Sequence, residues 1–130
     1  MVIDKEIIET QAWKAWLEPD GIIRVVLQPL AVIEIAEARL LTQAYGQLTG
    51  RRQNLILMDI SAIKSASKAA RDYCSTPEVV EMVRAIAFIT QSPTSRIIGN
   101  LVVGINKPPY PTRLFADELE AVEWLKRFTK

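Results

Sequence analysis

Histidine is absent from the 130 residues of this chain, and cysteine occurs once, at Cys74. Without an imidazole the protein has no Ser-His-Asp triad, no Cys-His dyad, no histidine metal ligand and no imidazole switch near neutral pH. A lone cysteine excludes an intramolecular disulfide, a Cys-x-x-Cys redox pair and a thiolate zinc cluster. These absences exclude many hydrolase designs, and a reducing, cytoplasmic setting fits them best.

A charge surplus and long apolar runs are also missing. The chain has 16 Lys and Arg against 15 Asp and Glu, a net charge of +1 that gives no basis for a nucleic-acid partner. The apolar run at residues 97–105 is interrupted by Asn100 and is far shorter than the roughly 20 residues of a membrane span. Charged residues near the N-terminus argue against a signal peptide or membrane anchor, so we expect a soluble protein without a membrane span.

What is present is typical of one globular domain. Apolar residues make up 49% of the chain and charged residues 24%, a composition far from that of disordered proteins. The length suits a single hydrophobic core, and there is no internal repeat, low-complexity tract or long linker. We therefore expect one domain over residues 1–130, with no cofactor.

The first quarter of the sequence predicts a β-hairpin. Residues 12–17 and 22–28 form its strands, residues 18–21 (Glu-Pro-Asp-Gly) form its turn, and residues 2–8 form an earlier strand. Trp13 and Trp16 point to opposite faces of the first hairpin strand. One ring is expected in the core, and the other lies at an association surface or beneath a helix of the same chain.

After residue 35, helices alternate with short apolar strands. Gly50 is placed to end the first helix, and the later helices begin at cap residues, namely Ser67, Thr76, Ser92 and Asp117. The expected helices cover residues 35–48, 67–73, 77–83, 92–105 and 117–128, and the expected strands cover residues 54–60, 85–90 and 112–115. The prediction is an α/β fold: a mixed, mainly parallel sheet with a leading β-hairpin and helices packed on it.

Two of these helices have apolar faces that are expected to be buried. In the fourth helix the face consists of Ile97, Ile98, Leu101, Val102 and Ile105. In the last helix it consists of Leu119, Val122, Leu125 and Phe128. Gly99 and Gly104 leave little side chain on the fourth helix, which indicates close packing on the sheet or another subunit, or an apolar ligand slot beneath the helix. If the slot exists, Asn100 and Asn106 are its polar groups. Otherwise Asn100 is a surface residue and Asn106 caps the end of the helix.

The order of elements, together with three local segments, resembles a known family. The segments are Met58-Asp59-Ile60-Ser61, Ser65-Ala66-Ser67 and the closing residues 114–125, which contain Trp124-Leu125. Over nearly the whole chain this pattern is similar to STAS domains, found in anti-sigma-factor antagonists and sulfate transporter tails, and to the SpoIIAA-like relatives of the CRAL-TRIO lipid carriers. The resemblance implies a STAS/SpoIIAA-like fold.

In the antagonist branch of that family, a serine within an Asp-Ser-Ser-Gly-like sequence is phosphorylated. Counted from Asp59, the acid of that motif falls on Ser67, the phosphoacceptor on Lys68 and the glycine on Ala70. The motif is therefore broken at its central position. A phosphorylated Ser67 or Ser65 requires a shift of one to three residues.

Two polar segments follow buried strands and are candidate binding sites. The first is residues 61–71, where an anion or a protein partner could be bound by Ser65, Ser67, Lys68 and Arg71. The second is the start of the fourth helix, where a phosphate or carboxylate could be bound by Ser92, Thr94, Ser95 and Arg96. In both segments helix capping and a solvated surface are the structural alternative.

These features predict a regulatory or protein-interaction module without catalysis, with a protein partner and self-association as a homodimer. The alternative is a carrier, as the CRAL-TRIO resemblance implies. Its slot beneath residues 97–105 would hold the apolar tail of a small molecule, and residues 92–96 would hold an anionic head group. An enzyme using Asp59, Arg71 or Arg96 is a third hypothesis, but no nucleophile and base are paired in the sequence.

Overall fold

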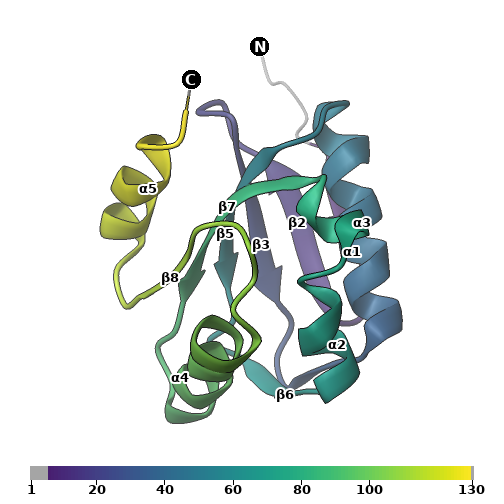
Figure 1. Cartoon of the computed structure of the whole chain (residues 1–130), viewed down its shortest axis with the longest axis vertical. Coiled ribbons are helices and arrows are strands. Elements are labelled where there is room, and N and C mark those ends of the chain that lie inside the picture. Colours follow the sequence, from purple (N-terminus) through teal and green to yellow (C-terminus); the bar gives the residue numbers. More distant parts are fainter. Residues whose placement is uncertain (1–5, 130) are drawn as a thin grey trace.

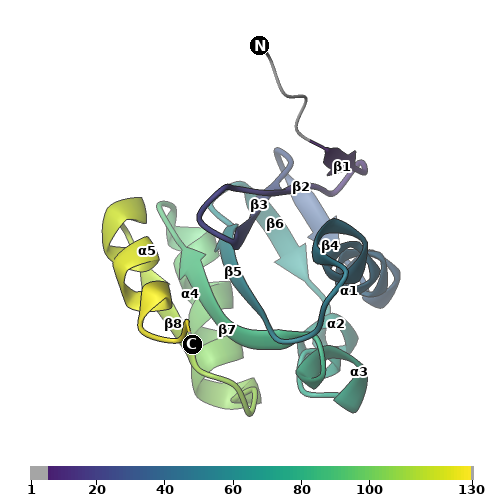
Figure 2. The ribbon, with the colours of Figure 1, turned by 90° about the horizontal axis from the view of Figure 1, so that it is seen from above.

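The computed structural model describes residues 6–129, and its centre is a curved mixed β-sheet (Figures 1 and 2). The sheet has six strands in the order β1-β2-β3-β5-β7-β8. Their bounds are β1 (Ile7–Glu9), β2 (Trp13–Leu17), β3 (Ile22–Leu27), β5 (Asn54–Asp59), β7 (Val83–Ile89) and β8 (Thr112–Phe115). The first three strands are antiparallel, and β3, β5, β7 and β8 run parallel. The predicted sheet is confirmed, whereas most of the predicted strand at residues 2–8 lies outside the described residues.

Helices cover both faces of this sheet. One face carries α1 (Ile35–Thr49), α2 (Lys68–Tyr73), α3 (Pro77–Val80), α4 (Pro93–Asn100) and the π-helix η1 (Leu101–Asn106), which continues α4. The other face carries α5 (Glu118–Lys126). Figure 2 shows α5 on the opposite side of the sheet from α1, α2 and α3. In residues 6–129, none of the helices has the length and apolar character needed to cross a membrane.

A second, two-stranded sheet was not predicted. Its parallel strands are β4 (Ala31–Ile33) and β6 (Ile63–Ala66). Strands this short carry no recognisable pattern, and they form only because distant segments pair. The Ser67 N–H donates to the Ile33 carbonyl at 3.0 Å, so this sheet brings the start of α2 close to the start of α1. The candidate binding segment 61–71 therefore contains a strand that the sequence did not predict.

The core consists of two apolar clusters, one on each face of the sheet. The larger lies beneath α1, α2 and η1, and includes Trp13, which is 1% exposed and donates its indole N–H to the Glu37 carbonyl at 3.1 Å. The smaller lies beneath α5 and includes Leu57 and Leu125. Trp16 is half-buried on the face opposite to Trp13, so the prediction of one core tryptophan is confirmed.

Two predicted helix faces are partly wrong. Ile97, Ile105 and Leu119 are exposed by 63%, 72% and 76%, respectively. The buried positions of α4 and η1 are instead Ser95, Gly99 and Val102, and those of α5 are Ala121 and Leu125. Successive residues of a helix are rotated by about 100° around its axis. The spacing of the apolar residues in these helices is therefore compatible with more than one buried face. The packing partner selects the face, and the change to π-helix at Leu101 alters the direction of later side chains.

Most of the predicted caps are present. The side chains of Ser67, Ser92 and Asp117 accept the backbone N–H groups of Ala70, Ser95 and Glu120 at 3.0, 3.2 and 3.1 Å. Gly50 ends α1 with a φ of 69°, as expected. Thr76 is the N-cap residue of α3 and a proline follows it, as expected, but the Thr76 hydroxyl donates to the Tyr73 carbonyl at 2.8 Å and does not cap the helix. The helix it precedes also ends at Val80, since Val83 already begins β7.

Close packing on the sheet accounts for Gly99. A Cβ at this position would lie 2.7 Å from Leu114 Cδ2 of β8 and 3.4 Å from Thr90 Cγ2. A side chain at position 99 would force Leu114 to shift, so Gly99 allows α4 to pack closely on the sheet. At Gly104 a Cβ would meet no other heavy atom within 4 Å, so packing within residues 6–129 does not explain that glycine.

Candidate functional site

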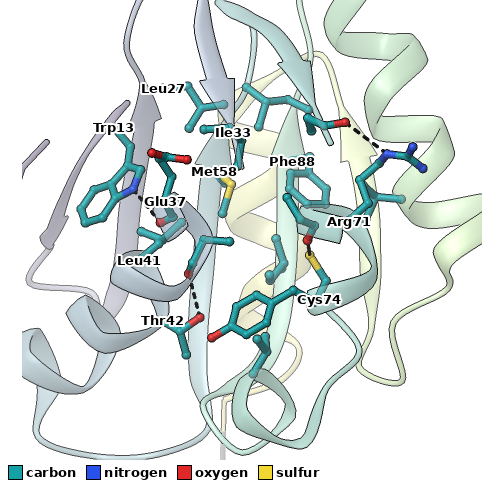
Figure 3. A pocket seen from close by; sticks show the side chains of 18 of the residues that line it. Trp13, Leu27, Ile33, Glu37, Leu41, Thr42, Met58, Arg71, Cys74 and Phe88 are labelled. Atoms are coloured by element: carbon teal, nitrogen blue, oxygen red, sulfur yellow. Dashed lines mark hydrogen bonds between the residues drawn. The ribbon is translucent and has the colours of Figure 1, made fainter. Parts of the chain in front are cut away.

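An apolar cavity lies between the sheet and the helices that cover its first face (Figure 3). Its volume is about 100 Å³. The lining is mostly aliphatic and aromatic. From the sheet it includes Trp13, Leu27, Met58, Ile86 and Phe88, and from the helices and their connections it includes Leu41, Tyr45, Tyr73, Val79, Val102 and Tyr110.

The cavity exists because small residues of the covering elements face large residues of the sheet. Alanine occupies three lining positions, namely Ala38 in α1, Ala66 in β6 and Ala70 in α2. An alanine side chain ends at Cβ and leaves space that a leucine would fill. Figure 3 shows Met58 and Phe88 of the sheet together with Leu41 and Thr42 of α1 around this space.

One end of the cavity is nearer to solvent than the other. Several lining residues there are only partly buried, namely Ile33, Ala38, Met58, Ala66, Arg71 and Ile98. Met58 and Ala66 lie at the carboxyl ends of β5 and β6. Open α/β sheets bind ligands beyond the carboxyl ends of their parallel strands, so this rim is where a ligand would enter.

Arg71 is the cation at this rim. Its Nε donates to the Ala66 carbonyl at 3.4 Å, and its Nη1 donates to Asn106 Oδ1 at 3.3 Å. Asn106 in turn donates to the Asp72 carboxylate at 2.6 Å, and Lys68 pairs with the same carboxylate at 2.7 Å. The hydrogen bond from Lys68 is the main reason that the pKa of Asp72 is lowered. This network ties α2 to the end of η1 and holds Arg71 beside the cavity.

Three tyrosines and the cysteine also line the cavity. The Tyr110 hydroxyl donates to the Cys74 carbonyl at 2.9 Å, and the Tyr73 hydroxyl donates to the Glu78 carboxylate at 2.7 Å. Burial raises the pKa of Tyr45, Tyr73 and Tyr110, and it raises the pKa of the Cys74 thiol to about 11. All four groups are therefore uncharged at neutral pH, and the thiol is a poor nucleophile there.

Of the residues predicted in segment 61–71, only Arg71 lines the cavity. Ser65 is exposed on β6, and Lys68 forms the exposed ion pair with Asp72. Ser67 accepts the Ala70 N–H, as the capping interpretation proposed. Phosphorylation at Ser67 or Ser65 stays a prediction, since nothing in the structure bears on it.

The segment predicted at the start of α4 does not reach the cavity. The Ser92 and Ser95 hydroxyls form a reciprocal capping box, in which each accepts the backbone N–H of the other residue. Ser92 Oγ also donates to the Ser61 carbonyl at 2.8 Å. Ser95 is fully buried. Thr94, Arg96 and Asn100 are exposed. The capping interpretation therefore accounts for Ser92 and Ser95, and anion binding here stays a prediction.

The residues of the enzyme hypothesis are not gathered in one place. Asp59 lies on the sheet face that carries α5 and accepts the Ser61 N–H at 2.9 Å. Arg71 lies on the opposite face, and Arg96 is exposed on α4. Within residues 6–129, there is also no group of three or more acidic, histidine or cysteine side chains suited to a metal ion.

An apolar slot is predicted beneath residues 97–105, whereas most of the cavity lining comes from other segments. Of the predicted apolar face, Ile98 and Val102 line the cavity at one edge. The remaining wall comes from α1, α2 and the sheet. Two sequence features belong to this wall: all 3 tyrosines of the chain line the cavity, and so do two alanines of the alanine-rich segment 66–70. Neither feature shows by itself that the residues meet.

One solved structure supports this fold. A protein of the DUF3478 family with a SpoIIAA-like fold, from Shewanella loihica PV-4, matches with a TM-score of 0.57 and 16% identity over 94% of this chain and 92% of that chain. A protein of unknown function from Arthrobacter sp. FB24 has 26% identity over 86% of this chain and 97% of that chain, with a TM-score of 0.32. A comparison with curated proteins gives no match.

The fold is therefore SpoIIAA-like, as the resemblance in the sequence implied. The likeness at 16% identity concerns the arrangement of the backbone and carries no function with it. A family profile gives a further match over residues 15–129, which extends from β2 to beyond the end of α5. The chain belongs to the family described as "Domain of unknown function (DUF7793)".

Proposed function

We propose that this protein is a non-catalytic binding module that holds a small apolar molecule in the cavity beneath α1, α2 and η1. The observation that carries the proposal is the cavity itself, whose lining is almost entirely apolar. A well-packed core has few voids larger than a water molecule, so a space of about 100 Å³ calls for an occupant or a reason. The carrier hypothesis required such a space.

The size of the cavity limits the ligand. An engineered apolar cavity of about 150 Å³ stays dry and binds benzene. The cavity here, at about 100 Å³, is somewhat smaller and suits a single ring or a short aliphatic chain. Residues 92–96 do not line it, so Arg71 replaces them as the group nearest to any polar end that protrudes at the rim.

The experiment is a titration with benzene, followed by protein NMR. We expect saturable shifts of amide signals from α1, α2 and β5, and an increase in melting temperature because the ligand binds only the folded state. Ala70→Leu fills the cavity from α2, and we expect it to weaken benzene binding at least tenfold. Ala70 is 3% exposed and belongs to the lining.

Ala69→Leu is the matched control, because Ala69 is exposed on the same helix and does not line the cavity. It should bind benzene as the parent protein does. If the added leucine at position 70 prevents folding, Ala38→Leu fills the cavity from the α1 side instead. The proposal is wrong if benzene gives no saturable binding to the parent protein.

A second candidate function is self-association through the uncovered half of the other sheet face. There α5 packs on β5, β7 and β8 and helps to bury Ile22 at the start of β3, while side chains farther along β3 and on β1 stay exposed. Ile7 and Val26 lie on this half, with exposures of 53% and 38%. They share the face because Ile7 pairs with Trp16 and Val26 with Lys14 in the strand register. Exposed apolar side chains on an uncovered part of a sheet favour burial against a second copy of the chain.

Sedimentation velocity over a range of concentrations tests this candidate. We expect the parent protein to form a dimer and Val26→Lys to sediment as a monomer. Leu119→Lys is the control, since Leu119 is 76% exposed but lies on α5. A parent protein that stays monomeric at all concentrations would remove the homodimer, and equal effects of the two substitutions would remove this face.

A further inference from the structure

Tyr45 differs from the other tyrosines of the cavity in having an unused hydroxyl. It is 3% exposed, it lies in α1, and it belongs to the cavity lining. Among the hydrogen bonds of residues 6–129, the hydroxyls of Tyr73 and Tyr110 each have a partner, whereas that of Tyr45 has none. Buried tyrosine hydroxyls usually find a partner. Among the side-chain N and O atoms of residues 6–129, Asn54 Oδ1 alone is both fully enclosed and without a partner, so the Tyr45 oxygen is open to a small molecule, and Tyr45 lines the cavity.

The polar groups near Tyr45 form their hydrogen bonds with other residues and none with its hydroxyl. The Thr42 hydroxyl, one turn earlier in α1, donates to the Ala38 carbonyl at 3.1 Å. The Cys74 thiol is directed to the Ala70 carbonyl at 3.7 Å. A water molecule at this place would need two to four polar partners, and the mostly apolar lining supplies few. The cavity is therefore the place from which a partner for Tyr45 can come.

The same surroundings are unsuited to a charge. Burial is the main reason that the pKa of Tyr45 is raised, and the neighbouring Cys74 and Tyr73 raise it further. Burial likewise raises the pKa of Tyr110, where Cys74 and Tyr45 add to it. A charged group of a ligand would suffer the same loss of hydration, and apart from Arg71 no Lys or Arg side chain is part of the cavity lining; Arg39 lies outside the lining, over the Tyr73 ring. Arg71 belongs to the partly exposed rim and not to this cluster.

We propose that the ligand of this cavity is a small apolar molecule with one uncharged hydrogen-bonding group, such as a phenol, an alcohol or a ketone, which pairs with the Tyr45 hydroxyl. This inference rests on the proposed function and adds the chemical class of the ligand. It also assigns Tyr45 as a specificity residue, because a buried hydroxyl that needs a partner favours a ligand that supplies one.

The experiment measures the affinities of phenol and benzene for the parent protein and for Tyr45→Phe by NMR titration. The substitution keeps the ring and removes only the hydroxyl. We expect it to weaken phenol binding about tenfold, because the phenol hydroxyl would then be buried without a partner. Benzene binding should stay unchanged, and the melting temperature of the unliganded variant should not fall.

Tyr110→Phe is the matched control, since it removes a hydroxyl from the same cavity that already donates to the Cys74 carbonyl. It should lower the melting temperature, and it should change the affinities for phenol and benzene by the same factor. Benzoate should bind much more weakly than phenol to the parent protein, because its carboxylate is charged.

Several outcomes would overturn the inference. If Tyr45→Phe changes the affinities for phenol and benzene equally, the Tyr45 hydroxyl does not select the ligand. If benzoate binds as tightly as phenol, the polar group need not be uncharged. In both cases saturable benzene binding still supports the proposed function. If neither benzene nor phenol binds, the proposed function and this inference fail together.

Discussion

Cys74 illustrates how one side chain gains its properties from burial. The thiol lies at the cavity among tyrosines, and burial raises its pKa from 9.0 to about 11. Below pH 9 the thiol keeps its proton in the folded and unfolded chains alike. Between pH 9 and 11 the unfolded chain releases the proton while the folded chain retains it, so the unfolded state gains stability.

We therefore expect the free energy of unfolding to fall by about 2 kcal/mol between pH 9 and 11 on account of this group. Chemical denaturation at a series of pH values measures the decline. In the Cys74→Ala variant the free energy of unfolding should fall less steeply with pH. A loss above pH 10 should remain because the pKa values of Tyr45 and Tyr110 are also raised. Identical slopes for the two proteins would show that Cys74 does not contribute.

Helix α2 is the element on which the candidate site most depends. It carries Ala70 and Arg71, and with only six residues it is too short to be stable without tertiary contacts. Its start is fixed by the pairing of β4 with β6 and by the Ser67 cap. The wall of the cavity thus depends on a short helix held at both ends, by the cap at Ser67 and by the contact of Arg71 and Asp72 with Asn106.

Loss of the Ser67 cap should therefore lower the free energy of unfolding by about 1 kcal/mol. Ser67→Ala removes the oxygen that accepts the Ala70 N–H. Ser65→Ala is the control, because Ser65 is exposed and among residues 6–129 its hydroxyl forms no hydrogen bond; we expect a change within about 0.5 kcal/mol. Urea denaturation measures both. Equal losses would contradict the structural role of the cap.

At the scale of the whole molecule, the sheet places two different surfaces back to back. The helices α1, α2 and η1 enclose the cavity on one face, while on the other face α5 leaves part of the hairpin uncovered. Strand β3 links the antiparallel hairpin to the parallel strands, so it contributes to both surfaces. Leu27 lines the cavity, and Val26 faces the uncovered side.

The elements with strong local signals are those that the sequence predicts well. The β2–β3 hairpin has a turn sequence and alternating apolar residues, and α1 has a regular spacing that ends at Gly50. Strands β4 and β6 have no such signal, because three or four residues gain their stability only from a distant partner. The exposed positions of Ile97 and Leu119 have a similar cause, since the partner and not the spacing selects which apolar residues are buried.

By itself, the sequence determined the fold class, the leading hairpin, most helix caps and the absence of histidine chemistry. These properties depend on residue type and on neighbours a few positions away. The tertiary structure alone decided that Tyr45, Tyr73, Cys74 and Tyr110 meet around one cavity, and that Ser92 and Ser95 do not belong to it. A cavity depends on how elements from distant parts of the chain fit together, and no local pattern encodes the space that they leave unfilled.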